Sequence, residues 1–153
     1  ITKALADLNE AVGDRVILTA GKMHASGILS EAGEKILTKE DAETFIEAGA
    51  DVLLLPAPGT VPGFTMEHAT ELIKTAHNKG VLAMTTIGTS QEGADEETIR
   101  QIALMCKMAG ADIHHIGDSG YMGMALPENI TAYSVAIRGK RHTYRRMAMS
   151  LVR

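Results

Sequence analysis

The stretch AGADVLLLP occupies residues 48–56, and its first five letters return almost unchanged as AGADI at residues 109–113. In both copies a helical pattern precedes the glycine and an apolar run follows the aspartate, as is typical of a turn from a helix into a buried strand. The spacing of 61 residues is the length of two strand–helix units, which indicates a duplicated quarter of an eight-unit ring. The alternative is that the repeat reflects only favourable turn chemistry.

Four short apolar runs predict four strands, and three of them are almost continuously apolar, as in parallel strands covered on both faces. The runs are Val16–Leu18, Val52–Leu55, Val81–Met84 and Ile113–Ile116. Helical patterns separate them, each preceded by a capping side chain or opened by a proline. The predicted helix starts are Thr38, Thr65, Asp95 and Pro127, and Gly139 is expected to bend or end the last helix.

This alternation predicts an α/β fold, a parallel (βα)4 half of a TIM barrel formed by residues 1–153 as one domain. A half barrel leaves two sheet edges unpaired, and natural proteins avoid such edges. We therefore expect a missing N-terminal half or a second copy of the chain, as a homo-oligomer, to complete the ring. Ile1 is not an initiator Met and opens a helical apolar pattern, which also predicts a processed or partial chain.

Composition and charge narrow the class of protein. Aromatic residues make up 3% of the chain and the formal net charge is −4, so we expect no nucleic-acid partner. The basic residues from Arg138 to Arg146 are expected to form a solvated helix face or a subunit contact. No apolar run is long enough for a membrane span, and we expect no membrane partner. The single cysteine, Cys106, cannot form an internal disulfide, which predicts a cytoplasmic protein.

Two loops rich in glycine and hydroxyl residues follow the third and fourth predicted strands. They resemble the phosphate-gripping loops of the phosphate-binding (β/α)8 barrel superfamily, in which the active site lies where the strands end. The resemblance implies a site for a phosphorylated metabolite. Its implied contacts are Gly88, Thr89, Ser90, Gly117, Ser119 and Gly120. Asp118 departs from the pattern, because an acid repels phosphate unless a cation lies between them.

Three residues after predicted strands are candidate catalytic groups. Lys22 follows the first strand, where a lysine can form a Schiff base with a carbonyl compound or bind an anionic group. His24 is a candidate general base, because imidazole titrates near neutral pH. In a hydrolase, Asp118 or His24 would instead activate water. The alternative is a solvated lysine and a hydrogen-bonded loop histidine without a catalytic role.

Metal binding is a further prediction for this end of the strands. His114 and His115 are neighbours in the fourth predicted strand, so their side chains are expected on opposite faces. The spacing of His115 after the AGADI turn resembles ribulose-phosphate epimerase barrels, which implies that His115 binds a metal, although Gly117 stands where those enzymes carry an acid. The alternative for either histidine is a hydrogen-bonded core residue. A resemblance to the phosphoenolpyruvate mutase and isocitrate lyase group implies a divalent metal held by acids that include Glu92 and Asp118.

Together these features predict an enzyme that acts on a small anionic, phosphorylated metabolite through lyase, aldolase or isomerase chemistry. One alternative is a hydrolase of a small ester or halide, although the sequence lacks the Gly-x-Ser-x-Gly nucleophile motif. Another is a non-catalytic module for metabolite binding or assembly. The sequence leaves the substrate and the reaction open.

Overall fold

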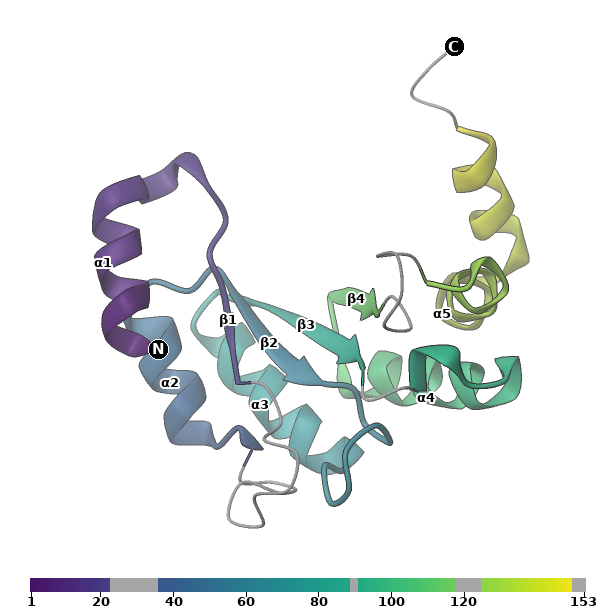
Figure 1. Cartoon of the computed structure of the whole chain (residues 1–153), viewed down its shortest axis with the longest axis horizontal. Coiled ribbons are helices and arrows are strands. Elements are labelled where there is room, and N and C mark those ends of the chain that lie inside the picture. Colours follow the sequence, from purple (N-terminus) through teal and green to yellow (C-terminus); the bar gives the residue numbers. More distant parts are fainter. Residues whose placement is uncertain (23–35, 89–90, 118–124, 150–153) are drawn as a thin grey trace.

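The computed structural model describes residues 1–22, 36–88, 91–117 and 125–149. Its strands alternate with helices along the chain (Figure 1). The elements in order are α1 Thr2–Val12, the 3-10 helix η1 Gly13–Arg15, β1 Thr19–Gly21, α2 Lys39–Glu47, β2 Val52–Pro56, α3 Met66–Asn78, β3 Leu82–Ile87, the 3-10 helix η4 Gln91–Gly93, α4 Glu96–Ala109, β4 Ile113–Ile116 and α5 Pro127–Ala148. The strands lie in the order β1-β2-β3-β4, and each neighbouring pair is parallel. The predicted half of a TIM barrel is confirmed.

The helices begin where their capping residues predict. Thr38 Oγ1 accepts a hydrogen bond from the N–H of Asp41 at 3.2 Å, and the Asp41 carboxylate accepts from the N–H of Thr38 at 3.1 Å. This capping box satisfies two N–H groups at the start of α2. Thr65 and Asp95 cap α3 and α4 through their side chains. The last helix opens at its predicted proline, and Gly139 interrupts it with a φ of 77°.

The first strand begins later than its apolar run predicts. A strand at Val16–Leu18 is wrong, because pairing with β2 starts where Thr19 meets Val52. The N–H of the preceding residue, Leu18, donates to the Asp51 carboxylate at 2.8 Å instead of entering the ladder. The apolar side chains before it stay outside the core, and Ile17 is 77% exposed.

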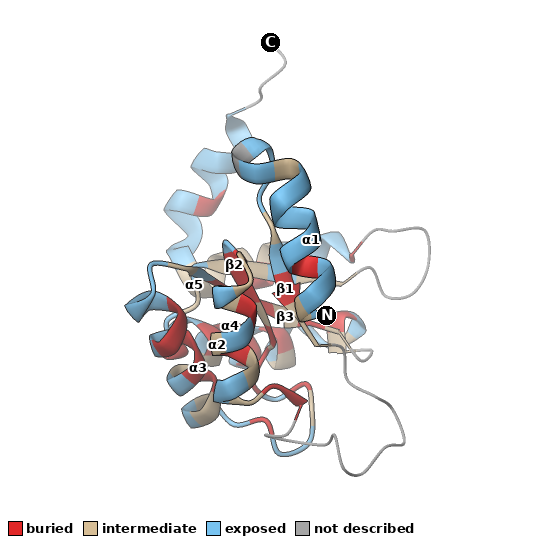
Figure 2. Ribbon diagram, turned by 90° about the vertical axis from the view of Figure 1, so that its left-hand side faces the viewer, coloured by how far each residue is buried: buried red, intermediate tan, exposed pale blue. Residues whose placement is uncertain are grey.

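Helices α2, α3 and α4 cover one face of the sheet, and the core lies between them and the strands (Figure 2). Alternate strand residues face this layer and are almost fully buried, among them Leu53, Leu55, Ala83 and Ile87. In the described part of the chain, no helix is long and apolar enough to cross a membrane.

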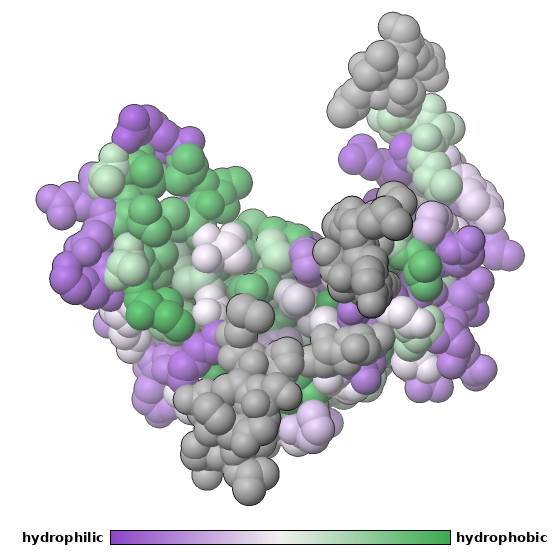
Figure 3. Space-filling view, viewed as in Figure 1, coloured by the Kyte–Doolittle hydropathy of each residue, from purple (hydrophilic) through white to green (hydrophobic). Residues whose placement is uncertain are grey.

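The other face of the sheet is concave. A hollow of about 450 Å³ lies at the amino ends of the strands, lined by residues of α1, η1 and all four strands. Figure 3 shows hydrophobic side chains along the inner side of α1 and over the neighbouring strands. Leu82, which lines the hollow, is 48% exposed. A closed barrel would cover this face with further strands.

Candidate functional site

The carboxyl ends of the strands bring together the predicted site residues that the structure describes. Lys22 directly follows β1, Gly88 follows β3 and Gly117 follows β4. Because the strands are parallel, these residues lie at the same end of the sheet. The remaining predicted catalytic and phosphate-binding residues lie outside the described residues and stay predictions: His24, Thr89, Ser90, Asp118, Ser119 and Gly120.

Lys22 is held by a carboxylate at the start of α2. Its Nζ donates to Oδ2 of Asp41 at 2.9 Å, and the lysine side chain is 34% exposed. Burial alone would raise the pKa of Asp41, but hydrogen bonds from Lys22 and Thr38 hold that pKa below its ordinary value. The ion pair joins the end of β1 to the capping box of α2 and presents an ammonium at this end of the sheet.

Gly117 is packed too closely for a side chain. A Cβ at this position would lie 3.1 Å from the carbonyl oxygen of Ile87 and 3.4 Å from Cγ of Glu92. The N–H of Gly117 already donates to the same Ile87 oxygen at 2.9 Å. Close packing therefore accounts for this glycine, and its N–H is occupied by the strand ladder rather than free for a phosphate. At Gly88, by contrast, a Cβ would meet no described atom within 4 Å.

Glu92 is a buried acid at the same end of the sheet. The residue lies in η4 and is 8% exposed. Its Oε2 is buried and has no hydrogen-bond partner within the described part of the chain. The turn that carries it is fixed by Asn129 of α5, whose Nδ2 donates to the carbonyl oxygens of Glu92 and Ala94 at 2.8 and 2.9 Å. The backbone of Glu92 is thus well held while one of its carboxylate oxygens is not.

His114 and His115 lie on opposite faces of β4, as predicted. Nδ1 of His114 lies 3.0 Å from the hydroxyl of Tyr133 beneath α5. Burial, and then the charge of Arg138, lower the pKa of His114. His115 is exposed on the other face, and its register partner in β3 is Thr86. Among the described residues, Thr86 Oγ1 is also buried without a hydrogen-bond partner.

The predicted metal ligands are only partly described. Within residues 1–22, 36–88, 91–117 and 125–149, no three His, Cys, Asp or Glu side chains lie close enough to hold a metal ion. His115 and Glu92 both lie at the carboxyl ends of the strands, but Asp118, the third candidate, lies outside the described residues. A divalent metal therefore stays a prediction.

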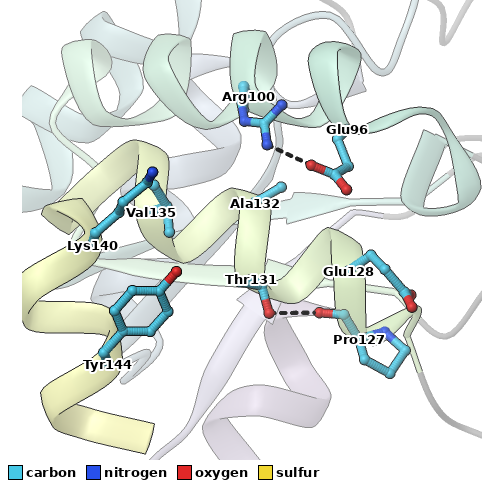
Figure 4. A pocket seen from close by; sticks show the side chains of 9 residues that line it. All are labelled: Glu96, Arg100, Pro127, Glu128, Thr131, Ala132, Val135, Lys140 and Tyr144. Atoms are coloured by element: carbon cyan, nitrogen blue, oxygen red, sulfur yellow. Dashed lines mark hydrogen bonds and ion pairs between the residues drawn. The ribbon is translucent and has the colours of Figure 1, made fainter.

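A separate cleft of about 380 Å³ lies between α4 and α5 (Figure 4). Figure 4 shows the ion pair of Arg100 and Glu96 on one wall, and Lys140 and Tyr144 on another. The last two belong to the segment of α5 after the interruption at Gly139. Groups of both charges line this cleft and no strand contributes to it, so it is distinct from the site at the strand ends.

Comparisons with known proteins agree with this fold. A family model described as a domain of unknown function, DUF7916, matches residues 1–153. Deoxyribose phosphate aldolase from Aeropyrum pernix, described as a unique tetrameric structure, is 19% identical with a TM-score of 0.63; the match covers 90% of this chain and 56% of the aldolase. A protein from Coccidioides immitis assigned as a deoxyribose-phosphate aldolase is 17% identical with a TM-score of 0.68; the match covers 92% and 55%. No curated protein sequence matches the chain.

These similarities show the fold alone, because both identities are below 20%. The chain spans little more than half the length of both structures, as half of a barrel should. Both neighbours are described as aldolases. The comparisons thus support the barrel, but not the narrower resemblance to ribulose-phosphate epimerase or phosphoenolpyruvate mutase barrels.

Proposed function

The chain belongs to the DUF7916 family, and we propose that it forms part of an enzyme that acts on a small anionic, phosphorylated metabolite by aldolase or other lyase chemistry. The substrate would bind at the carboxyl ends of the strands. The observation that carries the proposal is Lys22, a partly buried cation directly after β1 that lies 2.9 Å from Asp41. A lysine in this place is suited to bind an anion or to react with a carbonyl group.

Two further observations support the proposal. The structures of similar fold are described as aldolases, and this analogy of fold favours a lyase over other reaction classes. Gly88 follows β3 at the same end of the sheet, and a Cβ there would meet no described atom within 4 Å. A ligand could therefore approach this part of the backbone closely.

Lys22 would act in one of two ways. As a nucleophile, its free amine adds to the substrate carbonyl carbon, and loss of water leaves an iminium. The bond between the α and β carbons then breaks: the β-hydroxyl loses its proton to water and becomes an aldehyde, and the bonding electrons convert the iminium into an enamine, which is later protonated and hydrolysed. The ion pair must open first, and the ammonium must then lose its proton to water, because the pKa of Asp41 is held below its ordinary value. As an anion-binding group, Lys22 would remain an ammonium and hold the phosphate.

Borohydride trapping separates the two roles. The purified protein is incubated with phosphorylated aldehydes or keto acids, and sodium borohydride then reduces any iminium to a stable secondary amine. We expect the peptide containing Lys22 to gain the mass of the substrate less one oxygen, and the Lys22→Arg variant to gain nothing. Lys39→Arg is the matched control, because Lys39 is an exposed lysine at the start of α2.

Two negative outcomes have different meanings. An unmodified Lys22 with every compound would exclude the Schiff-base role but leave the anion-binding role. If, in addition, none of the phosphorylated compounds raised the melting temperature of the protein, the proposed substrate class would be wrong.

A second candidate is a non-catalytic metabolite-binding module, and the ion pair of Lys22 favours it. The contact with Asp41 ties β1 to α2, which is by itself a sufficient structural role for the lysine. This candidate predicts that Lys22→Ala lowers the melting temperature while binding of phosphorylated compounds persists without turnover. Loss of binding in a variant that remains folded would favour the enzyme instead.

A further inference from the structure

Two polar atoms near the carboxyl ends of β3 and β4 are buried without a partner in the described part of the chain: Thr86 Oγ1 and Glu92 Oε2. Glu92 is 8% exposed, so its side chain is more than nine-tenths buried. Thr85 Oγ1 is a third such atom, but it belongs to the helix-covered face, beside Cys106 and Tyr133. Unpartnered polar groups are costly to bury, and each one in a folded protein requires an explanation.

Thr86 and Glu92 both lie on the concave side of the sheet. Thr86 is the register partner of His115, which faces away from the helix layer. Gly117, two residues after His115, has the same orientation. A Cβ on Gly117 would meet Cγ of Glu92 at 3.4 Å and Cδ at 3.5 Å, so the acid covers that side of the glycine. Residues along a strand are about 3.3 Å apart and strands about 4.8 Å, so a group of a few atoms can reach from Thr86 to Glu92.

The two side chains together complement a ligand with more than one hydroxyl group. An ionised carboxylate only accepts hydrogen bonds, whereas a threonine hydroxyl can donate one. One ligand hydroxyl can donate to the first while a neighbouring hydroxyl accepts from the second, so a ligand with several hydroxyls satisfies both. An ammonium has no acceptor, an ionised phosphate has no donor, and the charge of Glu92 would repel the phosphate.

We propose that Glu92 and Thr86 bind hydroxyls of a polyhydroxylated, sugar-type ligand at the carboxyl ends of β3 and β4. Asn129 holds the turn of Glu92 through two backbone carbonyls, and Gly117 leaves the space that the Glu92 side chain fills. The acceptor is therefore positioned before the ligand arrives. The inference rests on the proposed function for the position of the ligand at the strand ends. It assigns the hydroxylated carbon chain of the ligand, rather than its phosphate, to the position beside Glu92 and Thr86.

Calorimetric binding of two probes tests the assignment. D-ribose 5-phosphate carries a phosphate and several hydroxyls, whereas 2-phosphoglycolate carries a phosphate and a carboxylate but no hydroxyl. We expect Glu92→Gln to weaken binding of ribose 5-phosphate about tenfold, because a charge-assisted hydrogen bond is lost. Binding of phosphoglycolate should stay unchanged or tighten, because a negative charge is removed. Glu97→Gln, which alters an exposed acid in the first turn of α4, is the matched control and should change neither affinity.

The melting temperature without ligand provides a second readout. A neutral amide is less costly to bury than a carboxylate, so Glu92→Gln should melt about 3 °C higher than the wild type. A Glu92 with a merely structural role would instead give a lower melting temperature.

The failures of the two proposals can be told apart. The hydroxyl assignment is overturned if the wild type does not bind ribose 5-phosphate, or if Glu92→Gln leaves that affinity unchanged or weakens both probes equally. If Glu92→Gln weakens ribose 5-phosphate selectively while the wild type shows neither turnover nor a trapped adduct, the assignment stands and the enzyme proposal fails.

Discussion

Two acids at the amino ends of the strands, Asp51 and Asp112, have the opposite environment to Glu92 at the carboxyl ends of β3 and β4. At the amino ends, Asp51 accepts a hydrogen bond from the N–H of Leu18 and Asp112 accepts one from the N–H of Ala83, both at 2.8 Å. At the carboxyl ends, Glu92 Oε2 has no such partner among the described residues. This contrast indicates that the two aspartates at the amino ends stabilise the fold, whereas Glu92 is the acid to which we assign a ligand in the proposal above.

The repeated AGAD turns account for the stable end. Asp51 ties the start of β2 to the residue before β1, and Asp112 ties the start of β4 to β3. The two glycines have matching φ values of 102° at Gly49 and 99° at Gly110. The repeat in the sequence therefore has one physical role in both copies, and small differences between the copies can be measured.

The largest expected effect compares Gly49→Ala with Gly110→Ala. Both glycines have a positive φ that strains an L side chain. A Cβ at Gly49 would lie 2.4 Å from Nδ2 of Asn9, whereas at Gly110 the nearest atom, on Ile73, is 3.5 Å away. We expect Gly110→Ala to lower the free energy of unfolding by about 1–2 kcal/mol and Gly49→Ala by about 3 kcal/mol, as measured by urea denaturation. Equal losses would contradict the added contact with Asn9.

A smaller effect concerns acid unfolding at the amino end. Burial alone would raise the pKa of Asp112, but hydrogen bonds from His77 and from the N–H of Ala83 hold that pKa below its ordinary value of 3.8. Because the folded state has the lower pKa, Asp112 stabilises the fold above about pH 4, and this contribution is lost as the pH falls through the folded pKa.

Asp112→Asn tests this pH dependence. Asparagine keeps an acceptor for Ala83 but does not titrate, so its stability at pH 7 should be within about 1 kcal/mol of the wild type. Its stability should fall less steeply than that of the wild type between pH 5 and pH 2, when unfolding is followed by circular dichroism. Parallel acid profiles for the two proteins would show that Asp112 has no depressed pKa.

The smallest expected effect belongs to the carboxyl end. Thr86→Val replaces a hydroxyl without a described partner by a methyl group, so it should leave the free energy of unfolding unchanged or raise it by up to about 1 kcal/mol. Thr85→Val is the matched variant on the helix-covered face, because the Thr85 hydroxyl is also buried without a described partner. We expect the same result for this variant in urea denaturation, because it also replaces a buried hydroxyl that has no described partner by a methyl group. A clear loss of stability in Thr86→Val would remove the contrast between the two ends.

Much of the fold could be predicted because its signals are local. The caps at Thr38, Thr65 and Asp95 act within one helical turn, and the apolar runs of β2 and β4 are read from neighbouring residues. The start of β1 could not be predicted in this way, because a side chain 33 residues away, Asp51, takes the N–H of Leu18.

The candidate site shows the same difference between local features, which could be predicted, and contacts between distant residues, which could not. The sequence indicated which strand ends matter and drew attention to Lys22, Glu92 and His115. It did not indicate that Lys22 pairs with Asp41, or that Glu92 packs on Gly117 and keeps an oxygen without a described partner. Such contacts depend on the distances between residues of different units.

The sequence by itself determined the order of strands and helices, the helix starts and the two glycine–aspartate turns, because each depends on interactions within a few residues. Only the tertiary structure decided the register of β1, the ion pair of Lys22 and the position of Glu92. The physical reason is that hydrogen bonding and burial at these places depend on how parallel strands align, and alignment is set by packing across the whole sheet.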